Sequence, residues 1–308
     1  MSFLKLLEGI RVPFLDLFFS KLTLFGEETL FMVVGLVCFW CVSKQLGRYL
    51  LNVGLGGTVM NQWLKLIFRV PRPWVRDPEF TIVESARAGA GGYSFPSGHT
   101  QVAVGTFGGI ARWTDKRWIC IPCIVIAVLV PFSRMYLGVH YPSDVLVGAA
   151  VSLALVLSLY PLMAGPRSTA RSTRWVLLAT CLLSLAYLVY VHTLDASGLE
   201  GEALTNLNHG VSNAWTLMGC SLGMWGIFEL DERWVHFDTK AVWWAQLLKI
   251  GLGVALVLGV RVGVKKLLGS SGPADMVRYL LIVLLGGGLY PMSFKWFAGL
   301  GKGAGKTE

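Results

Sequence analysis

Long apolar runs separated by short polar segments restrict what this chain can fold into. Several of them reach the roughly 20 residues that an α-helix needs to cross about 30 Å of hydrocarbon. The chain of 308 residues is 54% hydrophobic and only 15% charged, which leaves too little polar side chain to cover a soluble domain of this size. The sequence therefore predicts an all-α fold, a polytopic bundle of transmembrane helices.

Nine segments are predicted as membrane spans, after an N-terminal stretch of a different kind. The spans are residues 27–45, 49–68, 98–113, 117–138, 143–164, 174–194, 211–230, 241–263 and 276–299. Charged residues interrupt the helical apolar pattern of residues 2–24, which indicates an amphipathic helix in the membrane interface. We therefore divide the chain into an interfacial helix (1–26), a six-helix core (27–195) and a three-helix membrane extension (196–308).

Basic residues in alternate loops predict the orientation of the bundle in a plasma or inner membrane. The loops after the first, third and fifth spans carry Lys44 and Arg48, then Arg112, Lys116 and Arg117, then Arg167, Arg171 and Arg174. The positive-inside rule makes their side cytoplasmic. Near the last helices the pattern weakens: Glu229, Asp231 and Glu232 would lie inside, and Lys265 and Lys266 outside.

The net charge of +9 and the cysteine content do not indicate further partners. Basic loops beside apolar runs are explained by topology and by anionic lipid headgroups, so the bilayer is the expected partner and nucleic acid is not. Two CxxC pairs, Cys38/Cys41 and Cys120/Cys123, fall within apolar runs. They are typical of small buried hydrophobic residues, and we expect neither a metal site nor a disulfide there.

Three short motifs lie at the ends of spans that are predicted to face the non-cytoplasmic side. They are Lys65-x6-Arg72-Pro73, Pro96-Ser97-Gly98-His99 and Ser133-Arg134-x5-His140-x3-Asp144. Together they supply three cations, two histidines, a carboxylate and a glycine turn. These are the groups needed to hold a phosphate, attack it and protonate its leaving group.

The residue types fit this chemistry one by one. Arginine forks bind phosphate oxygens in pairs, whereas lysine acts as a point charge. Ser97 is a predicted N-cap, and Gly98 lets the backbone of a helix N-terminus approach an anion. Asp144 can hold one nitrogen of His140 protonated and leave the other free to attack phosphorus. Each residue alone is explained as a membrane anchor, polar surface or cap, and only the joint arrangement favours a phosphate site.

The spacing within the first motif adds a structural expectation. Lys65 and Arg72 are seven residues apart, close to two helical turns, and would share a face if the second span continued. Pro71 and Pro73 favour a bend instead.

The three motifs together resemble the complete signature of the type 2 phosphatidic acid phosphatase (PAP2) superfamily, and no signature position departs from it. The resemblance implies that His140 is a nucleophile that forms a phosphohistidine, that Asp144 orients it, and that His99 protonates the leaving group. It also implies that Lys65, Arg72, Ser97, Gly98 and Arg134 hold the phosphate, with no metal or other cofactor.

The expected function is therefore that of a membrane lipid phosphate phosphatase with its site on the periplasmic or extracellular face. Candidate substrates are a polyprenyl diphosphate such as undecaprenyl diphosphate, slightly preferred, phosphatidic acid, phosphatidylglycerophosphate or a sphingoid-base phosphate. The alternatives are a non-hydrolytic lipid-phosphate transporter or scaffold, and a phosphotransferase to another acceptor. Residues 69–97 form either a lid or a passive connection, and the C-terminal helices either a packing layer or a substrate-selective module.

Overall fold

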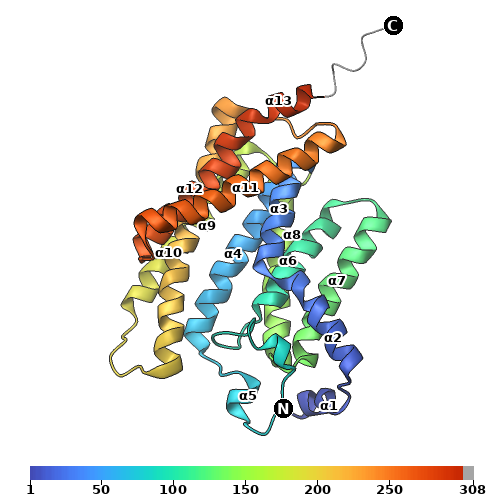
Figure 1. Ribbon diagram of the computed structural model, residues 1–308, viewed down its shortest axis with the longest axis vertical. Coiled ribbons are helices and arrows are strands. Elements are labelled where there is room, and N and C mark those ends of the chain that lie inside the picture. The colour runs from blue at the N-terminus through green and yellow to red at the C-terminus, as the bar shows by residue number, and fades with distance from the viewer. Residues whose placement is uncertain (301–308) are drawn as a thin grey trace.

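The computed structural model describes residues 1–300, and within them the chain is built of α-helices (Figure 1). The long ones are α3 (Glu28–Val37, continued by a π-helical turn, Cys38–Val42), α4 (Lys44–Phe68), α6 (Gly98–Trp113), α7 (Arg117–Tyr136), α8 (Pro142–Met163), α9 (Ala170–Thr193), α10 (Gly201–Leu230), α11 (Trp243–Leu268) and α12 (Gly272–Leu284). Four helices are short: α1 (Ser2–Gly9), α2 (Pro13–Leu22), α5 (Pro73–Arg76) and α13 (Phe294–Gly299). The all-α prediction is confirmed. Residues 301–308 of the predicted extension lie outside the described part.

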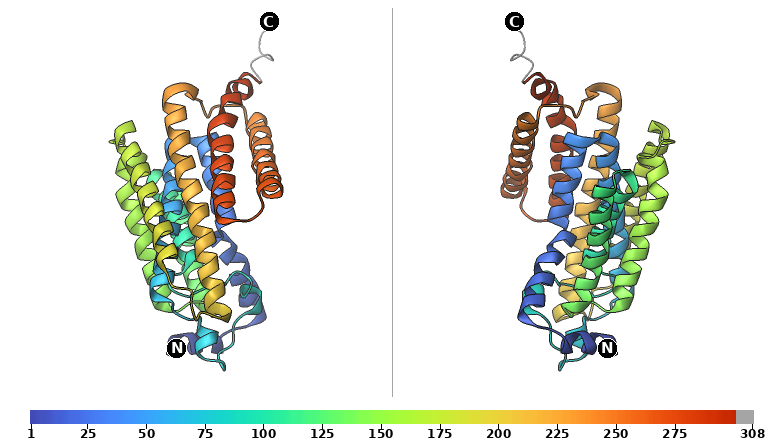
Figure 2. Two further views of the ribbon diagram at one scale, coloured as in Figure 1. Left: turned by 90° about the vertical axis from the view of Figure 1, so that its left-hand side faces the viewer. Right: turned by 90° about the vertical axis from the view of Figure 1, so that its right-hand side faces the viewer.

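Within residues 1–300, five helical segments are long and apolar enough to cross a membrane by themselves. They are α7, α8, α9, α11 and the segment Gly272–Gly299. Helices α4 and α10 are long, with 25 and 30 residues, but less apolar, and α6 has only 16 residues. Helix α4 packs against α3, α6, α8, α9 and α10, so little of it faces lipid and it can carry polar residues. Figure 2 shows α4, α8, α9 and α10 side by side along the long axis of the molecule.

The N-terminal residues form two helices where the sequence indicated one. The break lies at residues 10–12, and Pro13 begins α2. Arg11 at the break donates hydrogen bonds to the carbonyl oxygens of Tyr136 (3.0 Å) and Thr81 (2.9 Å). Helix α2 and the following α3 also have the length and composition of one span, bent by 51° at residue 27. The division of the chain at residues 26 and 195 remains a prediction.

Ion pairs at one end of the bundle join the basic loops to the end of α10. Lys44 lies 2.9 Å from Asp231, and Arg48 contacts both Asp231 and Glu232. Arg174 pairs with Glu229. Glu229, Asp231 and Glu232, which made the difference in charge between the two sides less clear in the sequence, are thus paired with basic residues at the same end of the bundle.

The long connection between α4 and α6 folds over the opposite end. It contains α5 and buries Phe80 and Ile82 in an apolar cluster with Leu4 of α1 and Tyr136 of α7. The Val83 amide donates to the carbonyl oxygen of Leu137 at 3.1 Å. This cluster fixes the turn between α7 and α8, from which His140 projects.

Helix α10 connects the core to the C-terminal helices. It packs against α4 and α9 on the core side and against α12 on the other. At the α10–α12 contact a Cβ atom on Gly219 would lie 2.2 Å from the carbonyl oxygen of Met276, so only glycine permits this approach. The N-terminus of α10 lies at the same end as the long connection (Figure 1).

Candidate active site

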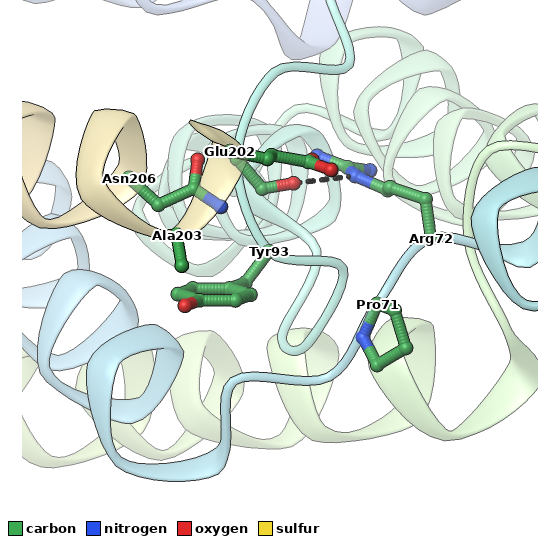
Figure 3. Close-up of a pocket in the computed structure, with 7 residues that line it drawn as sticks. Pro71, Arg72, Tyr93, Glu202, Ala203 and Asn206 are labelled. Atoms are coloured by element: carbon green, nitrogen blue, oxygen red, sulfur yellow. Dashed lines mark hydrogen bonds between the residues drawn. The ribbon is translucent and has the colours of Figure 1, made fainter. Parts of the chain in front are cut away.

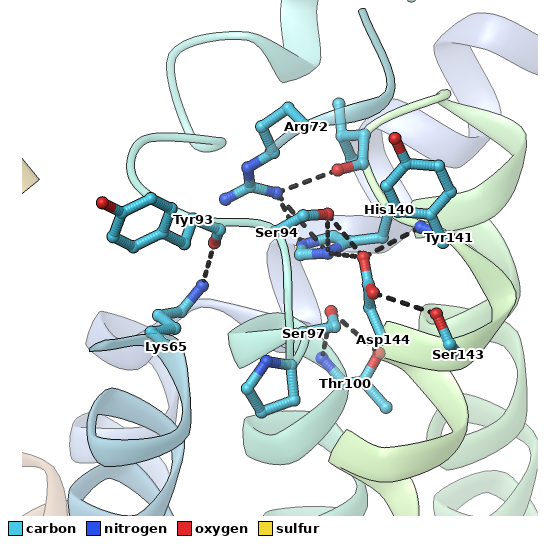
Figure 4. A network of polar contacts seen from close by, with 12 residues as sticks. Lys65, Arg72, Tyr93, Ser94, Ser97, Thr100, His140, Tyr141, Ser143 and Asp144 are labelled. Atoms are coloured by element: carbon cyan, nitrogen blue, oxygen red, sulfur yellow. Dashed lines mark hydrogen bonds and ion pairs between the residues drawn. The ribbon is translucent and has the colours of Figure 1, made fainter. Parts of the chain in front are cut away.

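The first motif supplies two cations from the end of α4 and the chain that follows. Lys65 lies in the last turn of α4, and its Nζ donates to the carbonyl oxygen of Tyr93. The helix does not continue to Arg72, because Arg69 ends it in a left-handed conformation (φ 46°). The turn after α4, and not a shared helical face, therefore places Arg72 beside His140 (Figure 4).

Each guanidinium nitrogen of Arg72 donates a hydrogen bond to a neutral acceptor. Nε donates to the carbonyl oxygen of Gly92 (2.9 Å) and Nη2 to that of Gly91 (2.8 Å). Nη1 donates to the carbonyl oxygen of Val139 (2.9 Å) and contacts Nε2 of His140 at 2.9 Å. Burial lowers the pKa of Arg72 to about 10, so the side chain is still a cation at neutral pH. Its charge is held beside His140 with no direct carboxylate partner in the described chain.

The local fold at the start of α8 aims the Asp144 carboxylate at His140. Pro142 begins the helix and Asp144 occupies its third position, where its Oδ2 accepts the backbone N–H of Tyr141 at 2.9 Å. Ser94 donates its hydroxyl to the same oxygen, and Ser143 donates to Oδ1 at 3.2 Å. Oδ2, which is held by the hydrogen bonds from Tyr141 and Ser94, lies 3.3 Å from Nδ1 of His140.

These contacts define which nitrogen of His140 carries the hydrogen. Arginine has donors only, so Nε2 must accept from Arg72, and Nδ1 must carry the hydrogen that points to Asp144. Burial, followed by the charges of Arg72, Arg134 and Lys65, holds the pKa of His140 well below its ordinary value. The imidazole is therefore neutral at pH 7, with the Nε2 lone pair turned into the cationic site.

The second motif brings a helix N-terminus against α8. Ser97 caps α6 by accepting the N–H of Thr100 at 3.4 Å, and its own N–H donates to the carbonyl oxygen of Asp144 at 3.0 Å. A Cβ atom on Gly148 would lie 2.8 Å from the carbonyl oxygen of Ser97, so glycine is required for this approach. Gly98 follows as the first residue of α6. The predicted cap is confirmed, and it fixes α6 to the helix that bears Asp144.

His99 lies in the first turn of α6, under the glycine-rich part of the long connection. A Cβ atom on Gly89 would lie 3.9 Å from its Nε2. The charge of a protonated His99 would further lower the pKa of His140. The two histidines therefore approach one space, His99 from α6 and His140 from the turn between α7 and α8.

Arg134 completes the site from the last turn of α7. It is 1% exposed, and its Nη1 donates to the Thr23 hydroxyl at 2.9 Å. Its Nε and Nη2 are buried and have no hydrogen-bond partner among the described residues. A buried guanidinium with two unused donors is a site for an anion.

The structure thus gathers all the predicted site residues at one end of the core. It also adds Ser94 and Thr23, which the sequence analysis did not identify. Ser94 stands three residues before Ser97, and this proximity was its only signal. Thr23 is 111 residues from Arg134, and no motif links the two. Among residues 1–300 no group of three or more His, Cys, Asp or Glu side chains is placed to hold a metal ion.

Two family models match the chain, one over the core and one over the C-terminal part. Residues 45–168 match the model described as PAP2 superfamily, and this segment contains every predicted site residue. Residues 215–303 match the model described as PAP2 superfamily phosphatase, transmembrane extension.

Curated relatives match mainly over the core. An undecaprenyl-diphosphatase, BcrC of Bacillus subtilis, is 34% identical over 39% of this chain and 61% of its own length. A probable sphingosine-1-phosphate phosphatase of Dictyostelium discoideum is 31% identical over 49% of this chain and 39% of its own length. Sphingosine-1-phosphate phosphatase 1 of Mus musculus is 26% identical over 84% of this chain and 62% of its own length. The chain thus spans less than two thirds of these relatives.

One solved structure is also similar. The crystal structure of Aquifex aeolicus LpxE is 27% identical and covers 51% of this chain and 92% of its own, with a TM-score of 0.45.

Proposed function

Because this chain belongs to the PAP2 superfamily, we propose that it is an integral-membrane phosphatase that hydrolyses a lipid phosphomonoester or diphosphate through a phosphohistidine. The observation that carries the proposal is the arrangement around His140. A neutral imidazole, with Nδ1–H on Asp144, presents Nε2 to a space bordered by Arg72, Arg134 and Lys65. A nucleophile held by a carboxylate and surrounded by cations suits phosphoryl transfer.

In the first step Nε2 of His140 attacks phosphorus, and the bond from phosphorus to the lipid oxygen breaks. His99, which carries a proton once the bound phosphate dianion offsets the surrounding cations, gives that proton to the lipid oxygen, so the lipid leaves as an alcohol or, from a diphosphate, as a monophosphate. Asp144 stabilises the positive charge that develops on the imidazole. The cations and the N-terminus of α6 neutralise the non-bridging oxygens.

In the second step water replaces the imidazole. His99, now neutral, takes a proton from the water as its oxygen bonds to phosphorus and the bond to Nε2 breaks. Inorganic phosphate is released and both histidines return to their starting states. A phosphate bound between Arg72 and His140 would take over the hydrogen bond that Arg72 donates to Nε2.

The rival functions use only part of this site. A lipid-phosphate transporter or scaffold needs the cations but not an imidazole oriented by a carboxylate. A phosphotransferase would use the same intermediate and exclude water, and no contact of the described residues favours a second acceptor over water.

The preference for a polyprenyl diphosphate stays a prediction. Relatives named for undecaprenyl diphosphate and for sphingosine 1-phosphate both match the core, which binds the phosphate that these lipids share. The mouse sphingosine-1-phosphate phosphatase matches over 84% of this chain, a larger share than the undecaprenyl-diphosphatase.

Phosphate release from lipid phosphates tests the proposal. Purified protein in mixed micelles should release inorganic phosphate from at least one of undecaprenyl diphosphate, phosphatidic acid, phosphatidylglycerophosphate and sphinganine 1-phosphate. The rate should be unchanged by excess EDTA, because protein cations neutralise the phosphate in the proposed mechanism. Binding of these lipids without phosphate release would contradict it, and loss of activity in EDTA with recovery on adding Mg²⁺ would contradict metal independence.

We also propose that the site faces the periplasm or the cell exterior. The support is the basic character of the opposite end, which persists after the ion pairs of α10 are counted. In a variant without native cysteines, Ser197→Cys beyond α9 should react with an impermeant maleimide in intact cells. Arg171→Cys at the other end should react only after permeabilisation. The reverse pattern would place the site in the cytoplasm.

A further inference from the structure

A pocket of about 220 Å³ opens next to Arg72, between the long connection and the N-terminus of α10 (Figure 3). Arg72, Gly92 and Tyr93 line one side, and Glu202 and Asn206 of α10 line the other. The roles proposed above for phosphate binding and cleavage use neither Glu202 nor Asn206.

We infer that this pocket is a subsite for a positively charged group that the lipid carries close to its phosphate. The inference rests on the proposed phosphatase function and names a class of substrate for it. Its basis is the chemistry of Glu202 and Asn206 and their position relative to Arg72.

The Glu202 carboxylate is unusual in this position because it borders a site built to hold an anion. It is near enough to Arg72 to act on its charge, yet the two form no ion pair in the described chain, since the Arg72 nitrogens donate to carbonyl groups and His140. A carboxylate here repels a phosphate dianion. If the substrate carries an ammonium group beside its phosphate, the Glu202 carboxylate attracts that ammonium group, and this attraction offsets the repulsion of the phosphate.

Asn206 gives the second indication of a polar ligand. The residue is 8% exposed and lines the pocket, and its side chain forms no hydrogen bond with the other lining residues (Figure 3). An amide that faces a pocket and bonds no lining residue is available to a ligand. Beside a carboxylate, this amide can accept a hydrogen from an ammonium or hydroxyl group of the lipid.

These features favour one class among the candidate lipids. A phosphorylated sphingoid base carries an ammonium group on the carbon next to the phosphorylated one and a hydroxyl on the carbon beyond. Polyprenyl diphosphates and phosphatidic acid have no such cation. The pocket therefore fits an amine-bearing lipid monophosphate, and α10 contributes to selection as well as to packing.

The test compares an amine-bearing substrate with its acylated counterpart. Sphinganine 1-phosphate and N-acetylsphinganine 1-phosphate differ in the charge of one nitrogen, and phosphatidic acid serves as a third substrate. Glu202→Gln should lower kcat/KM for sphinganine 1-phosphate by about fivefold, the upper range for a partly exposed ion pair. It should leave the acetylated lipid and phosphatidic acid unchanged or slightly improved.

Glu200→Gln is the matched control, because Glu200 is an exposed acid near the same helix start and does not line the pocket. It should leave the preference for the amine unchanged. A wild-type protein that hydrolyses both sphinganine lipids equally well, or a Glu202→Gln variant that slows all three substrates alike, would overturn the subsite and leave the phosphatase function intact. Failure of the wild type to release phosphate from any lipid phosphate would instead remove the proposed function, and the subsite with it.

Discussion

His140→Ala is expected to abolish phosphate release from every lipid phosphate that the wild-type protein hydrolyses. The substitution removes Nε2, which we propose attacks phosphorus and which lies 2.9 Å from Arg72. Loss of one member of a nucleophile–base unit elsewhere costs about 10⁴–10⁶ in kcat, so the residual rate should be at background. Binding of the lipid should persist, since the cations and the apolar contacts remain.

A rapid-quench experiment with ³²P-labelled lipid separates this role from a structural one. The wild-type chain should carry an acid-labile, alkali-stable label, as expected of a phosphohistidine, and His140→Ala should carry none. His209→Ala is the matched control, because His209 is an exposed histidine of α10 outside the site. Retention of near-wild-type activity by His140→Ala, or labelling that is lost equally in His209→Ala, would refute the phosphohistidine mechanism.

The helices could be predicted because apolar runs of membrane length have few alternative folds. Lipid offers the backbone no hydrogen-bond partners, so each run must form a helix and its ends must lie at polar segments. The same reasoning was weaker for α4 and α10, whose polar residues are accommodated by neighbouring helices. At the N-terminus, helical spacing could not show the break before Pro13, which Arg11 stabilises through contacts with the distant Tyr136 and Thr81.

The site could be predicted as a set of residue types but not as a geometry. Local spacing correctly placed Asp144 beside His140, because both belong to the first turn of α8 or the chain just before it. For Lys65 and Arg72 it left a shared helical face and a bend open, and the structure has the bend, since α4 ends at Arg69. Contacts between distant segments carry no local signal, which is why Thr23 and the pocket at Glu202 emerged only from the structure.

Arg134→Lys is expected to lower kcat by at least about tenfold, equivalent to about 1.4 kcal/mol, with a smaller change in KM. Arg134 has two buried donors, Nε and Nη2, that lack partners among the described residues, while Nη1 is held by Thr23. Lysine keeps the charge but loses the planar guanidinium. It therefore cannot donate two hydrogen bonds to the phosphate while also donating to Thr23, as Arg134 can. Such an interaction strengthens as charge builds on the oxygens in the transition state, whereas the lipid tail provides much of the ground-state affinity.

Thr23→Val is the graded comparison, since it removes the hydroxyl that positions Arg134 and leaves both free donors in place. It should lower kcat less than Arg134→Lys does, and in the double variant the two effects should not add, because both act through one guanidinium. Steady-state kinetics in mixed micelles, together with binding of the lipid to the inactive His140→Ala background, provide the measurements. If Arg134→Lys weakened lipid binding as much as it lowered kcat, the two donors would serve ground-state recognition of the phosphate and not the transition state.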